Sequence, residues 1–280
     1  MANGIVRPPE VTVRDLPYRI VNRFMLGVFW LLGLRFDIRG VENVPHTGGA
    51  VIASNHVSYL DFIFVGLAAY ERDRLVRFMA KKSVFTSRVS GPWMRGMKHI
   101  PVDREAGAAA FAEAITALQD GELIGIFPEA TISRSWELKK FKTGVSRLAL
   151  QAGVPIVPMV VWGGQRIFTV DKRYSLRRGK AISILVGEPL VPAEGAKAGR
   201  VMLDLHARMT DLLDQVQGDY PQQPSAPDDT WWLPRHLGGS APTQELAVQL
   251  ENAVLAARRA RAARKTAGKA AGRPSRWSAS

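Results

Sequence analysis

The chain has 280 residues, 46% of them hydrophobic, and its 38 Lys and Arg against 25 Asp and Glu give a formal net charge of +13. This length accommodates one substantial hydrophobic core with an appendage. The absence of cysteine excludes disulfides, thiol nucleophiles and thiolate metal sites, and it is compatible with a cytosolic compartment.

Metal and nucleotide motifs are missing from the sequence. The histidines show no His-Glu-x-x-His spacing, and the chain contains neither a Walker loop nor a Gly-x-Gly-x-x-Gly motif. We therefore expect no metal site and no bound cofactor. The five histidines are scattered along the chain, at His46, His56, His99, His206 and His236.

The N-terminal segment, residues 1–34, predicts a helix that associates with a membrane. It carries no secretory signal, and its apolar run over 24–34 is shorter than the roughly 20 residues that span a bilayer. A helix lying in a membrane surface and a buried core helix are equal alternatives. Basic and aromatic residues that suit a membrane surface lie within and beside the run, namely Tyr18, Arg19, Arg23, Trp30 and Arg35.

Short runs rich in branched residues then alternate with helical patterns. Helices are predicted over 61–70, 105–119, 142–152 and 198–217. This alternation predicts an α/β fold over residues 35–217, with a central mixed sheet flanked by helices. The predicted strands are 35–38, 50–53, 76–80, 98–102, 123–127, 156–161 and 182–186.

The C-terminal part predicts an extension of this domain. Residues 218–257 form a wrapping loop and a helix, the helical pattern itself running from Thr243 to about Lys265. Residues 258–280 hold no acid, and subtracting their eight basic residues from +13 leaves +5 elsewhere. We expect them to be a basic, disordered tail. The eight are Arg258, Arg259, Arg261, Arg264, Lys265, Lys269, Arg273 and Arg276.

The run Asn55-His56-Val57-Ser58-Tyr59-Leu60-Asp61 lies between the strand at 50–53 and the helix at 61–70. On a continuous helix, His56 and Asp61 would diverge by about 140°. They can meet if His56 precedes the regular turn and folds back. Asp61 would then accept a hydrogen bond from one ring nitrogen and leave the other free to take a substrate proton.

Two other interpretations of this run stay open. Ser58-x-x-Asp61 is also a capping box, with an acid in the first turn of a helix. Ser58 lies close to His56 in the sequence, so a serine hydrolase or a ping-pong transferase is a minor alternative. No Gly-x-Ser-x-Gly elbow supports it.

Three further blocks follow, and all are expected to lie at one edge of the sheet. They are Gly96-Met97-Lys98-His99-Ile100-Pro101-Val102-Asp103-Arg104, Phe127-Pro128-Glu129-Ala130-Thr131-Ile132-Ser133 and Val154-Pro155-Ile156-Val157-Pro158. With Asn55-His56-x4-Asp61, their order and spacing resemble those of the glycerolipid acyltransferases, the lysophosphatidate acyltransferase family. The resemblance covers roughly residues 30–190.

The resemblance implies the roles of the motif residues. His56 would be the catalytic base and Asp61 would orient it, Arg104 would bind the acceptor phosphate, and Glu129 and Thr131 would contact the acceptor. The family usually has glycine where this chain has Ala130, whose Cβ disfavours a positive φ, so we expect altered acceptor fit. Ile132 stands where arginine is common; Arg134 or the lysines at 139, 140 and 142 would replace its charge.

The resemblance also implies the reaction and the setting. A fatty acyl group would move from acyl-CoA or acyl-ACP, a co-substrate, to the free hydroxyl of 1-acyl-glycerol-3-phosphate, forming phosphatidate. The enzyme would lie at the cytoplasmic face of the cell membrane, peripheral or monotopic. Another lysophospholipid or hydroxyl lipid is the alternative acceptor. A basic nucleic-acid-binding protein is the alternative of a different class, although we expect no nucleic-acid partner.

Overall fold

The computed structural model describes residues 16–88, 90–102, 107–171 and 173–271. It divides into a large unit, residues 1–133 with 138–227, and a small unit, residues 134–137 with 228–280. The strands are β1 (Arg35–Arg39), β2 (Ala50–Ser54), β3 (Val76–Lys81), β4 (Ile100–Val102), β5 (Leu123–Ile126), β6 (Ile156–Trp162) and β7 (Ala181–Val186). The α-helices are α1 (Leu16–Leu31), α2 (Asp61–Tyr70), α3 (Lys82–Phe85), α4 (Ser90–Gly96), α5 (Gly107–Gln119), α6 (Gly144–Ala152), α7 (Ala198–Gly218) and α8 (Gln244–Ala271), and 3-10 turns are η2 (Val41–Asn43), η3 (Gly164–Arg166) and η4 (Arg235–Leu237).

The large unit is built on one mixed sheet with strand order β1-β7-β6-β2-β5-β3-β4. All neighbouring strands are parallel except β6 and β7, which are antiparallel. The carboxyl ends of β6, β2, β5, β3 and β4 therefore share one edge of the sheet. This confirms the α/β fold and the mixed central sheet predicted from the sequence.

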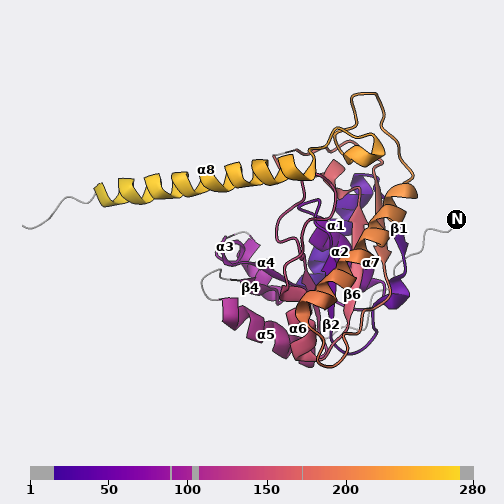
Figure 1. Ribbon diagram of the computed structural model, residues 1–280, viewed down its shortest axis with the longest axis vertical. Helices are drawn as coiled ribbons and strands as arrows, with labels where there is room; N and C mark the ends of the chain where they lie inside the picture. Colours follow the sequence, from indigo (N-terminus) through magenta and orange to yellow (C-terminus); the bar gives the residue numbers. More distant parts are fainter. Residues whose placement is uncertain (1–15, 89, 103–106, 172, 272–280) are drawn as a thin grey trace, which may run out of the picture. The chain divides into compact units, whose positions relative to one another are not determined.

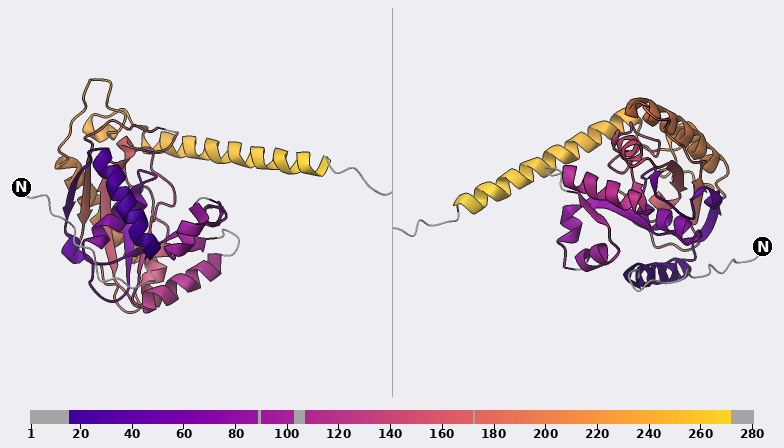
Figure 2. Two further views of the ribbon diagram at one scale, coloured as in Figure 1. Left: turned by 180° about the vertical axis from the view of Figure 1, so that it is seen from behind. Right: turned by 90° about the horizontal axis from the view of Figure 1, so that it is seen from below.

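Helices cover both faces of this sheet (Figure 1). Two side chains, Phe29 of α1 and Phe64 of α2, pack in the same apolar core as the alternate residues Ile182, Ile184 and Val186 of β7. Helices α5, α6 and α7 cover the other face, and the views of Figure 2 place α1 on the side opposite to them. Because both faces are covered, the central strands are apolar throughout, as β6 shows with all seven residues buried.

Helix α1 carries apolar side chains both toward the core and toward solvent. Tyr18 and Phe29 are buried, whereas large apolar side chains on the other side are 47–79% exposed. These are Leu16, Ile20, Phe24, Trp30 and Leu31. Within the described residues, no helix has the length and apolar character needed to cross a membrane.

The structure differs from the predicted elements at a few points. The strand predicted over 98–102 begins only at Ile100, because Lys98, two residues after the end of α4, adopts a positive φ of 55°. The short helices α3 and α4 were not predicted; four and seven residues are too few for a periodic signal. Helix α8 continues to Ala271, a few residues beyond the end at about Lys265 that the helical pattern predicted.

The small unit has its own aromatic contacts. The indole N–H of Trp136 donates to Trp231 O at 2.8 Å, and the two rings meet edge to face. His236 Nδ1 lies within hydrogen-bond distance of Glu137 Oε1, at 3.0 Å, and Trp232 is only 1% exposed. The tryptophans of the predicted wrapping loop are therefore packing residues.

Candidate active site

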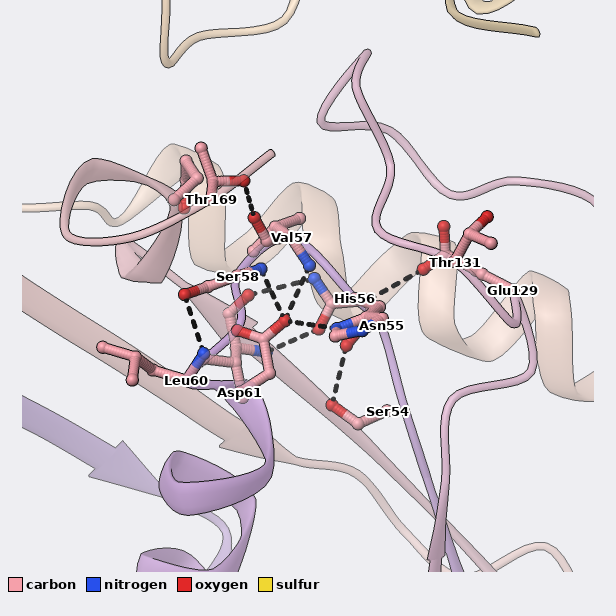
Figure 3. Close-up of polar contacts among 12 residues, drawn as sticks. Ser54, Asn55, His56, Val57, Ser58, Leu60, Asp61, Glu129, Thr131 and Thr169 are labelled. Carbon is pink, nitrogen blue, oxygen red and sulfur yellow. Dashed lines mark hydrogen bonds and ion pairs between the residues drawn. The ribbon is translucent and has the colours of Figure 1, made fainter. Parts of the chain in front are cut away.

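The side chains of His56 and Asp61 meet at the junction between β2 and α2 (Figure 3). His56 Nδ1 lies 2.9 Å from Asp61 Oδ2. The same oxygen accepts the backbone N–H groups of Val57 and Ser58, each at 2.7 Å. The contact expected from the motif is confirmed, and its cause is the one anticipated: His56 precedes the helix, so the loop folds back over the first turn.

The Asp61 carboxyl group is fully enclosed. Its burial raises its pKa, while the hydrogen bond from His56, the His56 ring charge and the two N–H donors favour the ionised form and oppose that rise. The second oxygen, Oδ1, is buried without a hydrogen-bond partner among the described residues. A Cβ added to Gly164 would lie 3.2 Å from this oxygen and 2.9 Å from Ser58 Cβ.

Ser58 supports the loop in a way that differs from the predicted capping box. Its hydroxyl donates to Phe168 O at 2.7 Å and accepts the Leu60 N–H at 3.1 Å, whereas the Asp61 N–H approaches the backbone oxygen of Ser58. Only the reverse half of the box exists, in which Asp61 accepts the Ser58 N–H. With its hydroxyl hydrogen directed at Phe168 O and no exposure to solvent, Ser58 does not have the geometry of a nucleophile.

The imidazole of His56 is held from a second direction by an aromatic stack. Its ring lies on Phe127, with centroids 4.2 Å apart and planes 16° apart, and Phe127 stacks in turn on Phe78. The His56 side chain remains 20% exposed. One ring nitrogen is therefore bound to a carboxylate, and the ring keeps access to solvent, which is the arrangement that a general base requires.

Asn55 anchors the start of the loop to the neighbouring strand. Its side-chain amide donates to Val161 O at 3.0 Å and accepts the Val161 N–H at 2.8 Å. These two hydrogen bonds continue the pairing of β2 with β6 by one residue beyond the end of β2. The fixed position of Asn55 determines where His56 leaves the sheet.

Glu129, from the loop after β5, reaches the same place. Its Oε1 accepts the His56 backbone N–H at 2.9 Å, and its Oε2 accepts the Lys139 N–H at 3.3 Å. The side chain is only 4% exposed, and this burial raises the pKa of Glu129 to about 8, against the effect of the two N–H donors. Its carboxyl group therefore contacts backbone groups of two loops.

The remaining residues of the third block line the same loop. Lys139 Nζ contacts the hydroxyl of Thr131, and this places a half-buried cation beside the block. Ala130 is exposed and adopts a φ of 63°, so the residue takes the conformation that its Cβ disfavours. Ile132 is buried at 6% exposure and leaves no cation at its position.

The second and fourth blocks have different outcomes. Arg104 lies outside the described residues, although the strand before it, β4, ends at the same edge as β2. His99 of the same block is a core residue that accepts the Phe78 N–H at 3.1 Å, and burial lowers its pKa to about 4.

The prediction that Val154–Pro158 lies at this edge is wrong, because the block enters β6 at the strand's opposite end.

What reaches the site from β6 is its carboxyl end and the turn beyond it. Gly164 packs under Asp61, and Thr169 Oγ1 donates to Val57 O at 2.7 Å. The sequence predicted no role for either residue, nor the stack of Phe127 on His56 or the Asn55 contact, since each depends on a partner distant in the sequence. The one available signal was the unusual Gly163-Gly164 pair directly after an apolar strand.

Within the part of the chain that the structure describes, no three His, Cys, Asp or Glu side chains gather as a metal site would require. The contacts made by Asp61, Glu129 and Asn55 fix the His56 imidazole in the way that acid–base chemistry requires.

Comparisons with known proteins agree with this class of site. A family model described as Acyltransferase matches residues 35–162, which include the whole His56–Asp61 loop and the Glu129 block. The chain is 32% identical to the 1-acyl-sn-glycerol-3-phosphate acyltransferase of Bacillus subtilis over 66% of its own length and 88% of that protein. It is 29% identical to the human 1-acyl-sn-glycerol-3-phosphate acyltransferase alpha, with 63% of this chain and 62% of that protein matched.

A solved structure has the same fold. The crystal structure of the 1-acyl-sn-glycerophosphate acyltransferase PlsC from Thermotoga maritima superposes with a TM-score of 0.63 over 75% of this chain and 83% of that chain, at 20% identity. The chain belongs to the acyltransferase family that includes these 1-acyl-sn-glycerol-3-phosphate acyltransferases. This confirms the family and the enzyme class, an O-acyltransferase, that the four sequence blocks indicated.

Proposed function

We propose that the protein transfers a fatty acyl group from an acyl thioester to the free hydroxyl of 1-acyl-glycerol-3-phosphate and so forms phosphatidate for phospholipid biosynthesis. The observation that carries this proposal is the 2.9 Å contact between His56 Nδ1 and Asp61 Oδ2, inside the region matched by the family model. The names of the Bacillus subtilis and human relatives support the choice of acceptor.

His56 is the general base of the proposed reaction. We assign the Nδ1–H to the hydrogen bond with Asp61, so that Nε2 is the atom that takes the acceptor's hydroxyl proton. The hydroxyl oxygen then attacks the thioester carbonyl carbon and forms a C–O bond. When the tetrahedral intermediate collapses, the C–S bond breaks and the proton held by His56 passes to the departing thiolate.

Asp61 positions the imidazole and stabilises its charged form. Three donors converge on one of its oxygens, so the carboxylate cannot rotate without losing backbone hydrogen bonds from Val57 and Ser58. The imidazole is fixed both by this carboxylate and by the ring of Phe127. Pre-organisation of this kind lowers the barrier because no reorientation is needed when the proton moves.

The acceptor phosphate needs cations. We assign it to Arg104, whose planar guanidinium matches phosphate oxygens, and to Lys139, which lies against Thr131. Glu129 was expected to contact the acceptor. Its two hydrogen bonds to backbone N–H groups support a different role, in which Glu129 positions His56. Thr131 and Ala130 stay the proposed acceptor contacts of this loop.

The enzyme is proposed to work at the cytoplasmic face of the cell membrane, with α1 lying in the lipid surface. The support is the stripe of exposed apolar side chains on α1, which includes Phe24 at 68% and Trp30 at 79% exposure. Replacing both residues, as Phe24→Ser with Trp30→Ser, should weaken the binding of the protein to vesicles while leaving its fold intact, because neither side chain is in the core. Unchanged sedimentation with vesicles would contradict a role for α1.

The reaction is tested with purified protein, lysophosphatidate and, in parallel, acyl-CoA or acyl-ACP as donor. His56→Ala should lower the rate of phosphatidate formation by about a hundredfold or more. The matched control is His46→Ala, because His46 is an exposed histidine in the loop before β2. Activity of His56→Ala near the wild-type rate would overturn the mechanism, and no turnover of any lysophospholipid by the wild type would overturn the activity.

The phosphate assignment needs its own measurement. Arg104→Ala should chiefly raise the KM for lysophosphatidate, because the interaction is made to the bound acceptor as well as to the transition state. Arg200→Ala, which removes a 76%-exposed arginine side chain from α7, is the control. An effect confined to the KM of the acyl donor would contradict the assignment.

A further inference from the structure

The sheet edge that carries His56 also receives two segments outside the catalytic loop. Strand β7 is antiparallel to β6, and β1 is parallel to β7, so both β7 and β1 begin where β6 ends. Arg35 at the start of β1 is the register partner of Ala181 at the start of β7. The C-terminal end of α1 and the connection leading into β7 are therefore brought to the edge of the catalytic loop.

These two segments contact each other. The Gly179 N–H donates to Leu32 O at 3.0 Å, and the Arg35 guanidinium donates to Gly179 O at 3.1 Å. A Cβ on Gly33 would lie 3.5 Å from the guanidinium of Arg178. The end of α1 and the connection before β7 thus form one continuous surface.

The connection from Ile167 to Gly179, of which Lys172 lies outside the described residues, starts as a small hairpin. Phe168 and Tyr174 form an antiparallel bridge. The Thr169 N–H donates to Arg173 O at 2.9 Å, and the Ser175 N–H donates to Ile167 O at 2.8 Å. These bonds give the connection a defined conformation.

The base of this hairpin is joined to the catalytic loop by three hydrogen bonds. Thr169 Oγ1 donates to Val57 O at 2.7 Å, and Phe168 O accepts both the Ser58 hydroxyl at 2.7 Å and the Tyr59 N–H at 3.1 Å. Figure 3 shows the Thr169 contact above the His56–Asp61 pair. Any surface that holds the hairpin therefore also holds the loop that carries His56.

Large apolar side chains on this hairpin are exposed to solvent. Tyr174 is 72% and Leu176 68% exposed, and Phe168, at 40%, packs on Tyr59, which is itself 43% exposed. Three exposed arginines lie in the same stretch, and Asp171 is the exposed acid beside them. We call this set the loop patch: Tyr59, Phe168, Arg173, Tyr174, Leu176, Arg177 and Arg178.

We propose that the loop patch seats in the surface of an anionic lipid bilayer and holds the mouth of the His56 site against it. The inference rests on the proposed function, since the acceptor of that reaction is a lipid held in such a surface. Apolar and aromatic side chains flanked by arginines combine contact with acyl chains and attraction to anionic headgroups. The patch adjoins the end of α1, where Trp30 and Leu31 are exposed.

The net positive charge of the loop patch favours an anionic bilayer as its partner. Three arginines against one acid leave a net positive surface around apolar groups, which suits the negative potential of anionic phospholipids. The arginines should therefore contribute to vesicle binding, and this contribution should weaken when the vesicles are neutral or when the ionic strength rises.

The apolar part is tested by flotation of the full chain with vesicles of phosphatidylglycerol and phosphatidylcholine. Tyr174→Ser with Leu176→Ser should lower the partition coefficient by about tenfold or more, since both side chains lose their contact with lipid. The matched control is Val191→Ser with Leu203→Ser, because those residues are 73% and 66% exposed elsewhere on the same unit. Equal partitioning of the patch variant and the control would overturn the proposal.

The basic part is tested by Arg177→Gln with Arg178→Gln. This variant should bind the anionic vesicles no more tightly than pure phosphatidylcholine vesicles, which it should bind as the wild type does, whereas Arg200→Gln with Arg208→Gln on α7 should leave both unchanged. Unaltered binding of the patch variant to anionic vesicles would overturn the proposal. So would a wild-type protein that floats with no vesicle, which would leave the patch to a protein partner.

Activity separates this inference from the proposed reaction. The Tyr174→Ser, Leu176→Ser variant should lose about tenfold in rate with lysophosphatidate presented in vesicles and keep the wild-type rate with a short-chain lysophosphatidate dissolved as monomers. Loss with both substrates would overturn the docking role. If the wild type acylates neither, the proposed reaction fails, and the flotation result still decides whether the patch binds lipid.

Discussion

The backbone N–H of His56 donates to Glu129 Oε1 at 2.9 Å, although the two residues are 73 positions apart in the sequence. Through its other oxygen, Glu129 accepts the Lys139 N–H, so one buried side chain joins the loop after β2 to the loop after β5. The position of the imidazole therefore depends on this carboxyl group as well as on Asp61. Its burial has a consequence for stability that can be measured.

Glu129→Gln should remove a pH dependence of the unfolding free energy. Burial raises the pKa of the folded carboxyl group to about 8, above the usual value of 4.5 in an unfolded chain. The folded state thus retains a proton that the unfolded state releases, and the stability from this proton is complete below pH 4.5 and is lost as the pH rises through about 8. The wild type should lose a few kcal/mol over this range.

Denaturant unfolding of both proteins between pH 5 and pH 8 measures this effect. As the pH rises, the unfolding free energy of the wild type should fall relative to that of the variant, since glutamine cannot titrate. Glu113→Gln, an exposed position on α5, is the control and should not alter the slope. Parallel curves for wild type and Glu129→Gln would contradict the assignment of a retained proton.

Asp61→Asn should keep the loop in place and lower kcat. The amide oxygen can accept the hydrogen bonds that Oδ2 now accepts from Val57, Ser58 and His56. The lost negative charge no longer stabilises the imidazolium, so we expect a loss of roughly 10²–10⁴-fold in kcat. Steady-state kinetics with circular dichroism of the variant would measure this, and a kcat within tenfold of the wild type would argue against the dyad. Asp37→Asn on β1 is the control.

Gly164→Ala should act on catalysis through Asp61. The added Cβ would meet Ser58 Cβ at 2.9 Å and Asp61 Oδ1 at 3.2 Å, so the carboxylate must shift. A displacement of this kind should lower kcat by about tenfold to a hundredfold with little change in the acceptor KM. Gly199→Ala, where an added Cβ meets nothing within 4 Å, is the matched control. A raised KM with unchanged kcat would place Gly164 in acceptor binding instead.

The strands could be predicted because their signal is local. Buried strands such as β6 and β7 are short segments rich in branched apolar residues, and the predicted helices bury one face at a 3.6-residue period. The sequence could not predict which end of each strand meets the site. That depends on strand direction and order, and for this reason the Val154–Pro158 block was placed at the wrong edge.

The site could be predicted only where its residues are close in the sequence. His56 and Asp61 lie in one short loop, so the physical possibility of their contact could be judged from the spacing. The groups that hold them, Asn55 with Val161 and Gly164 under Asp61, depend on the pairing of β2 with β6. Pairing between distant segments leaves no signal in a single sequence.

Ala130 allows a direct test of backbone strain in the loop after β5, because it adopts a positive φ that is costly for a residue with a Cβ. Its φ is 63°, and its side chain is exposed, so no packing compensates for the strain at the Cβ. An L-residue in this region costs about 1–2 kcal/mol, whereas glycine adopts it freely but loses more backbone entropy on folding. Ala130→Gly should therefore raise the unfolding free energy by about 0.5–1 kcal/mol.

Thermal and denaturant unfolding of Ala130→Gly measure this gain. The control is Ala193→Gly, an exposed loop alanine outside the positive-φ positions, which should be neutral or destabilised. Assaying Ala130→Gly with lysophosphatidate and with other lysophospholipids separates stability from acceptor choice. If the missing Cβ widens the approach to the acceptor, the variant should gain relative activity with larger headgroups. A destabilised variant would mean that the positive φ at Ala130 is not strained.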